Sequence, residues 1–174
     1  LTVQERWLPG NDLWLAETMN LLGLVCRRMA DYPPVRPLYE RALAIREQVL
    51  GLNHPDTAQS LNHLAVYLKE TGDSVDRAAA RPLYERALAI REQVLGPNHP
   101  DTAWSLNSFA IYLIGTGDPT DRAAARPLFE RALAIREQVL GPLNPDTAHS
   151  LSNLALFLQE NGEPADGSAA RPLF

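Results

Sequence analysis

The sequence predicts an all-α solenoid of antiparallel helix hairpins, about three and a half repeats long. A sixteen-residue string is repeated with a single change, and its copies cover residues 36–51, 81–96 and 126–141. A second string, His-Pro-Asp-Thr-Ala or Asn-Pro-Asp-Thr-Ala, begins at His54, His99 and Asn144. Both strings keep a spacing of 45 residues. A period of this length indicates stacked units that bury their apolar faces only against their neighbours.

Length and composition favour one elongated domain over residues 1–174. Its repeats are expected at about 12–51, 52–96, 97–141 and 142–174, with the last one truncated. A net charge of -5 and a pI of about 5.3 argue against nucleic-acid and membrane partners, since both need a basic face. The single cysteine, the lack of a long apolar run and the lack of a signal peptide predict a cytoplasmic location.

The segment from Pro55 to Thr71 is predicted to form the first helix of a repeat, called helix A. Its apolar residues recur at spacings of three and four, as on one face of an amphipathic helix, at Ala58, Leu61, Leu64, Ala65 and Leu68. Asn53 or His54 precedes Pro55, and proline suits the first helical position because its missing N–H has no partner there. Gly72 is expected to end the helix in the left-handed conformation.

A second helix, called helix B, is predicted over about 78–95. Its broad apolar stripe includes Tyr84 and Arg91. Pro82 lies near the expected start, where a proline costs little, and Gly96 with the following proline ends the helix. The first repeat is three residues shorter, and we assign the extra residues of the later repeats to the loop between helices A and B.

The helix pairs resemble the tetratricopeptide repeat, in particular the long variety found in kinesin light chain. The family's large-small pair in helix A falls on Leu64-Ala65, and its small-aromatic-small set in helix B falls on Ala80, Tyr84 and Ala87. The phrases His-Pro-Asp-Thr-Ala and Arg-Ala-Leu-Ala-Ile-Arg-Glu are close to the same subclass. The resemblance covers nearly the whole chain. It implies a right-handed superhelix whose inner wall is built by one face of every helix A.

Several short patterns are better explained by structure than by chemistry. His-Pro-Asp resembles a cochaperone loop, but its recurrence before each helix A indicates a cap. The four histidines lack metal-ligand spacing, and Cys26 has no Cys-x-x-Cys partner. The glycines of 115–118 lack the Lys-Ser/Thr of a phosphate site and read as a helix end. No catalytic, cofactor-binding or metal-binding residue is predicted, so the chain is not expected to be an enzyme.

The resemblance places a peptide-binding groove on one face of the A helices. Its positions fall on Glu17, Asn20, Leu24 and Arg27 in the first repeat, Gln59, Asn62, Val66 and Lys69 in the second, Trp104, Asn107, Ile111 and Ile114 in the third, and His149, Ser152, Leu156 and Gln159 in the fourth. The asparagine ladder is suited to hold an extended backbone, since an amide both donates and accepts. Trp104 is expected to be an apolar anchor.

Two functions remain open at this stage. The first is a non-catalytic module that binds a peptide or protein segment in the groove, as part of a larger scaffold or signalling protein. The alternative is a structural array that self-associates through its terminal repeats, because the interface between near-identical repeats is the same everywhere. The asparagines also have a second interpretation, in which they only stabilise neighbouring helices.

Overall fold

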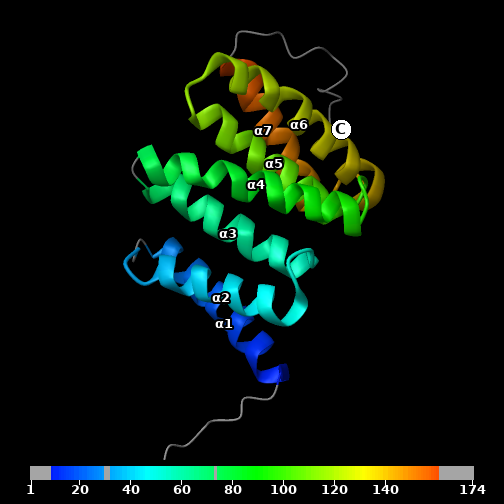
Figure 1. Ribbon diagram of the computed structural model, residues 1–174. Helices are drawn as coiled ribbons and strands as arrows, with labels where there is room; N and C mark the ends of the chain where they lie inside the picture. The colour runs from blue at the N-terminus through cyan, green and yellow to red at the C-terminus, as the bar shows by residue number, and fades with distance from the viewer. Residues whose placement is uncertain (1–8, 30–31, 73, 161–174) are drawn as a thin grey trace, which may run out of the picture. The chain divides into compact units, whose positions relative to one another are not determined.

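The computed structural model describes residues 9–29, 32–72 and 74–160, which form seven helices and no strand (Figure 1). They belong to two compact units, residues 1–94 and 95–174. Unit 1 contains α1 (Pro9–Arg28), α2 (Val35–Leu50), α3 (Pro55–Thr71) and α4 (Ser74–Val94). Unit 2 contains α5 (Pro100–Gly115), α6 (Pro119–Leu140) and α7 (Pro145–Glu160). Helices A of the repeats are α1, α3, α5 and α7, and helices B are α2, α4 and α6.

Within each unit, every helix packs against the next one along the chain. The predicted apolar face of α3 is buried in full, at Ala58, Leu61, Leu64, Ala65 and Leu68. It meets the small residues Ala80 and Ala87 of α4, which have no exposed surface. In unit 2 the same positions of α5 and α6 are buried, including Ala103, Leu106, Ala110, Ala125 and Ala132. The helix hairpins predicted from the period are thus confirmed.

Caps fix the start of each later helix A. His54 Nδ1 accepts a 3.1 Å hydrogen bond from the backbone N–H of Asp56, and Pro55 occupies the first turn. His99 makes the same bond at the start of α5. Asn144 replaces the histidine before α7, and its Oδ1 accepts from Asp146 N at 2.9 Å. The imidazole nitrogen and the amide oxygen both accept from a backbone N–H of the first turn that has no partner within the helix. This explains why asparagine can replace the histidine.

The B helices of the second and third repeats begin earlier than predicted. α4 starts at Ser74 and runs through Pro82, and α6 starts at Pro119 and runs through Pro127. The start of α6 is capped by Asp118, whose Oδ1 accepts from Thr120 N at 2.7 Å. The assignment of the extra residues to a loop was therefore wrong, because this cap and the following alanine run favour helix.

The predicted conformation of Gly72 is also wrong. Its φ of -74° and ψ of 155° are extended, so a left-handed residue does not end α3. A Cβ at this position would lie 2.3 Å from Asp76 Cβ, so close approach of the next helix is what requires glycine here. A positive φ is found instead after each B helix, as at Gly96 with φ of 97°, and at Gly117 after α5 with φ of 78°.

Candidate functional site

In unit 1 the A helices α1 and α3 lie side by side, and a buried asparagine joins them. Asn20 Nδ2 on α1 donates a 3.0 Å hydrogen bond to Ser60 Oγ on α3. Asn20 and its counterpart Asn62 on α3 are both buried. These amides therefore lie inside the packed helices, as the second interpretation of the asparagines expects.

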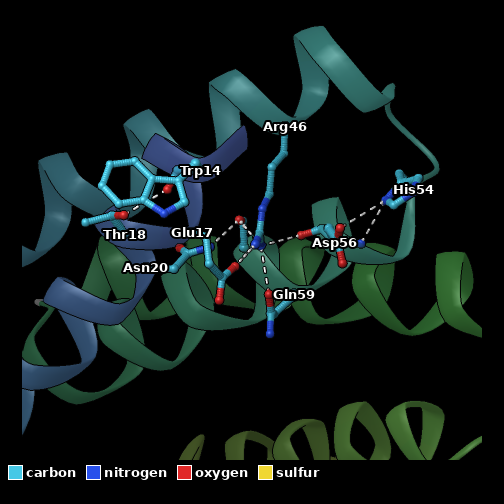
Figure 2. A network of polar contacts seen from close by, with 9 residues as sticks. Trp14, Glu17, Thr18, Asn20, Arg46, His54, Asp56 and Gln59 are labelled. Carbon is cyan, nitrogen blue, oxygen red and sulfur yellow. Dashed lines mark hydrogen bonds and ion pairs between the residues drawn. The ribbon is translucent and has the colours of Figure 1, made fainter. Parts of the chain in front are cut away.

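Arg46 of α2 is the centre of the polar network between the first two repeats, shown in Figure 2. Its side chain is only 4% exposed, and Nη1 donates to Asp56 O at 2.8 Å, Gln59 Oε1 at 2.9 Å and Ser60 Oγ at 3.0 Å. Nη2 pairs with the carboxylate of Glu17 on α1. A buried guanidinium thus fixes Glu17 and Gln59, two of the predicted groove residues, and its charge is balanced locally.

Arg136 of α6 takes the same place in unit 2 with different neighbours. Its Nη1 donates to Asp146 O at 3.0 Å and to Ser150 Oγ at 2.6 Å. These two hydrogen bonds to the next helix A match those of Arg46 to Asp56 O and Ser60 Oγ. The positions of Glu17 and Gln59 are occupied here by Trp104 and His149. Burial lowers the pKa of Arg136, and Asp146 partly opposes that shift.

In unit 2 a pair of asparagines joins α5 to α7. Asn153 Nδ2 on α7 donates a 3.0 Å hydrogen bond to Oδ1 of the buried Asn107 on α5. The two A helices of this unit therefore meet at this hydrogen bond.

The structure separates the predicted groove residues into three classes. Asn20, Asn62 and Asn107 are buried. The half-buried ones are Leu24, Arg27, Gln59, Val66, Lys69, Trp104, Ile111 and Ile114. The exposed ones are Glu17, His149, Ser152, Leu156 and Gln159.

The half-buried and exposed residues differ in chemistry between the two units. Unit 1 is charged: Arg27 of α1 lies 3.6 Å from Glu70 of α3, and burial lowers the pKa of Lys69. Unit 2 is apolar: Trp104, Ile111 and Ile114 recur along one face of α5, and Leu156 on α7 is 57% exposed. At the predicted groove positions, unit 2 has four large apolar side chains, whereas unit 1 has Leu24 and Val66.

The sequence analysis did not predict that the arginines of helix B at 46, 91 and 136 are buried, although their positions indicate it. The sixteen-residue string carries an arginine at 46, 91 and 136, each on the otherwise apolar stripe of helix B. All three are buried. Arg81, by contrast, faces solvent and pairs with Glu85 at 3.1 Å, which is the ordinary i,i+4 contact of an exposed helix.

Other kinds of site receive no support from the described helices. None of them combines the length and the apolar character that crossing a membrane requires. Over the described residues, His, Cys, Asp and Glu nowhere gather in threes in a way that would hold a metal ion.

Comparison with known proteins agrees with this architecture. A tetratricopeptide repeat model matches residues 57–101 and 102–146, and a second model of the same description matches 14–76. No curated protein matches the chain.

Solved structures share the fold. BtubC (BKLC) from P. vanneervenii aligns with a TM-score of 0.74 at 23% identity, over 92% of this chain and 61% of that one. The chain therefore spans about three fifths of that protein's length. A kinesin light chain candidate from Podosopora anserina with nearly identical TPR-like repeats aligns with a TM-score of 0.75 at 24% identity, over 90% of this chain and 69% of that one.

Tetratricopeptide repeats are protein–protein interaction modules, and their family and fold are generally non-catalytic. The matched repeats cover more than half of the sequence, and the structural neighbours carry repeats of kinesin light chain type. The chain belongs to the tetratricopeptide repeat family, as an all-α helical repeat solenoid.

Proposed function

We propose that this chain binds an extended segment of a partner protein at the half-buried and exposed groove positions of its A helices, with unit 2 as the principal anchor. The observation that carries the proposal is the row of Trp104, Ile111 and Ile114 on α5 beside the exposed Leu156 of α7. Large apolar side chains that remain partly open on a folded surface are the usual centres of binding energy.

The equivalent positions in the second repeat argue that this row is not required for packing. Trp104, Ile111 and Ile114 correspond to Gln59, Val66 and Lys69, and α3 folds with this more polar set. The larger apolar residues of α5 therefore supply surface that the fold does not demand. A partner segment with an apolar side chain fits this face.

The buried asparagines have a supporting role in this proposal. Asn107 is hydrogen-bonded to Asn153 and sets the spacing of α5 and α7, so that the half-exposed residues on both helices contact one partner segment.

The proposal is tested with peptides selected from a random library on the full chain. We expect the selected peptides to lose at least about tenfold in affinity for Trp104→Ala, which corresponds to about 1.4 kcal/mol. Leu143→Ala is the matched control, since Leu143 is 88% exposed in the same unit but lies outside the A helices. Circular dichroism shows whether both variants keep their helical content. Equal affinity of the peptides for the two variants would reject unit 2 as the anchor.

A further inference from the structure

One face of α1 is unusually apolar and exposed. Trp14 is 70% exposed and Met29 is 74% exposed, and Leu21 and Val25 between them are each more than half exposed. These residues recur along one side of α1 and the turn that follows it, with the hydroxyl of Thr18 between Trp14 and Leu21. An exposed apolar stripe of this kind marks a surface that receives another protein element.

The repeat register identifies what an A helix receives on this face. Asn20 aligns with Asn62, so Leu21 and Val25 of α1 correspond to His63 and Tyr67 of α3. In α3 both of these side chains lie against Tyr39 of the preceding helix B, with ring centroids 5.5 Å and 6.4 Å away. The exposed stripe of α1 is therefore the face on which an A helix packs against the B helix of the repeat before it.

The same B helices also deliver an arginine to this face. Arg46 donates to Asp56 O and Ser60 Oγ of α3, and Arg136 donates to Asp146 O and Ser150 Oγ of α7. Each buried guanidinium is thus bound by two acceptors of the A helix. One is a backbone carbonyl, and the other is a serine hydroxyl one helical turn later.

α1 retains both of these acceptors. The register places Trp14 O at the position of Asp56 O and Thr18 Oγ1 at the position of Ser60 Oγ. The two groups are hydrogen-bonded to each other at 2.8 Å on the surface of α1, as Figure 2 shows. The hydroxyl donates in this bond, so the lone pairs on both oxygens can still accept from a guanidinium.

The geometry points to a docking site on α1 for the B helix of another tetratricopeptide repeat, a surface separate from the A-helix face of unit 2. The occupant is an amphipathic helix with an aromatic ring seven residues before an arginine. The chain carries this signature three times, at Tyr39 and Arg46, at Tyr84 and Arg91, and at Phe129 and Arg136. The ring packs over Leu21 and Val25, and the guanidinium binds Trp14 O and Thr18 Oγ1.

The test uses a fluorescent peptide with the sequence of residues 81–96, stapled between positions 85 and 89 so that it is helical before binding. Both positions are exposed on α4, so the staple does not occupy the packing face. Titration with the full chain is followed by fluorescence anisotropy. We expect saturable binding that weakens at least about tenfold when the peptide carries Arg91→Met, and little change with Arg81→Met.

Protein variants then locate the site. We expect Leu21→Glu with Val25→Glu to abolish peptide binding, while Leu52→Glu, at another exposed apolar position of unit 1, leaves it intact. Ala155 is exposed on α7 at the position of the buried Ala65 of α3. Binding that survives the double variant but is lost with Ala155→Glu would place the peptide on α7 and overturn the proposal. Sedimentation equilibrium tests the other possible occupant: a dimer that the double variant dissociates, without peptide binding, would overturn the proposal and assign the face to a second copy of the chain. Absence of both peptide binding and dimerisation would also overturn the proposal.

Discussion

The guanidinium of Arg46 on α2 forms an ion pair with the carboxylate of Glu17 on α1 while it donates three further hydrogen bonds to α3. One side chain of a helix B therefore ties together the two A helices on either side of it. Because the guanidinium is buried and the carboxylate is half exposed, the arginine is the partner whose loss leaves buried acceptors unsatisfied.

We expect Arg46→Met to lower the free energy of unfolding by about 2–3 kcal/mol, because Asp56 O and Ser60 Oγ lose a charged donor in a buried position. Arg81→Met is the matched control, since Arg81 pairs with Glu85 at side chains that are 43% and 53% exposed, and its effect should be clearly smaller. Urea unfolding followed by circular dichroism measures both. Similar midpoints for the two variants would show that the buried network contributes nothing to stability.

Gly23 of α1 is a second position where packing decides the residue. A Cβ there would lie 2.5 Å from Cε1 of Tyr39, a ring with no exposed surface that has no room to retreat. We expect Gly23→Ala to destabilise the chain by about 1 kcal/mol or more, since the overlap outweighs the gain in helix propensity. Gly115→Ala, where a Cβ meets nothing within 4 Å, should instead raise thermal stability.

We expect the imidazole of His63 to make the free energy of unfolding depend on pH. Burial, with added repulsion from Arg27, Arg46 and Arg91, lowers the pKa of this imidazole from 6.5 to about 4. The unfolded chain therefore binds a proton at His63 that the folded chain rejects, and the free energy of unfolding falls as the pH drops from about 6.5 towards 4. Above this window His63 contributes no slope.

The comparison of His63→Asn with wild type isolates this contribution. The aligned position of α7 is Asn153, so an asparagine is compatible with the face. We expect the urea midpoint of His63→Asn to fall less than that of wild type across this pH window. His149→Asn, at an exposed imidazole, should keep the wild-type slope. An unchanged slope in His63→Asn would mean that the buried imidazole is protonated as readily as a free one.

The helices were predictable from the sequence because their signals are local. The cap at His54, the apolar spacing after it and the glycine after each helix B lie within a few residues of the features they determine. The start of α6 had an equally local signal, since Asp118 precedes Pro119 as an N-cap precedes the first helical residue. This signal was given too little weight because Pro82, the equivalent of Pro127 in the preceding repeat, was interpreted as lying near the start of helix B.

The site was predictable only in its register. The resemblance placed Asn20, Trp104 and their counterparts on one face of each helix A, and the structure separates them by depth. Depth depends on how closely neighbouring helices approach, which a single helix pattern does not encode. The asparagines are buried by an adjacent A helix, as in the bond from Asn20 to Ser60. The sequence analysis did not predict that Arg46 connects α1 and α3, because an isolated arginine on a helix is usually solvated.

The bond between Asn107 and Asn153 offers a direct test of the two interpretations of the ladder. A double-mutant cycle with Asn107→Ala and Asn153→Ala should give a coupling of about 0.5–1.5 kcal/mol in unfolding experiments, because each change removes one partner of the same hydrogen bond. Asn107→Ala with Ser152→Ala is the control cycle, since Ser152 Oγ bonds Ala148 O within its own helix. That pair should show no coupling.

The same variants separate positioning from direct contact when a selected peptide is bound. If Asn107 only holds α5 beside α7, then Asn107→Ala and Asn153→Ala should weaken the peptide to the same extent, and the double variant should weaken it no further. If Asn107 itself holds the peptide backbone, Asn107→Ala alone should carry the loss, because Asn153→Ala leaves that amide in place and frees its oxygen to accept from the peptide. Isothermal titration of the three variants against wild type distinguishes these patterns.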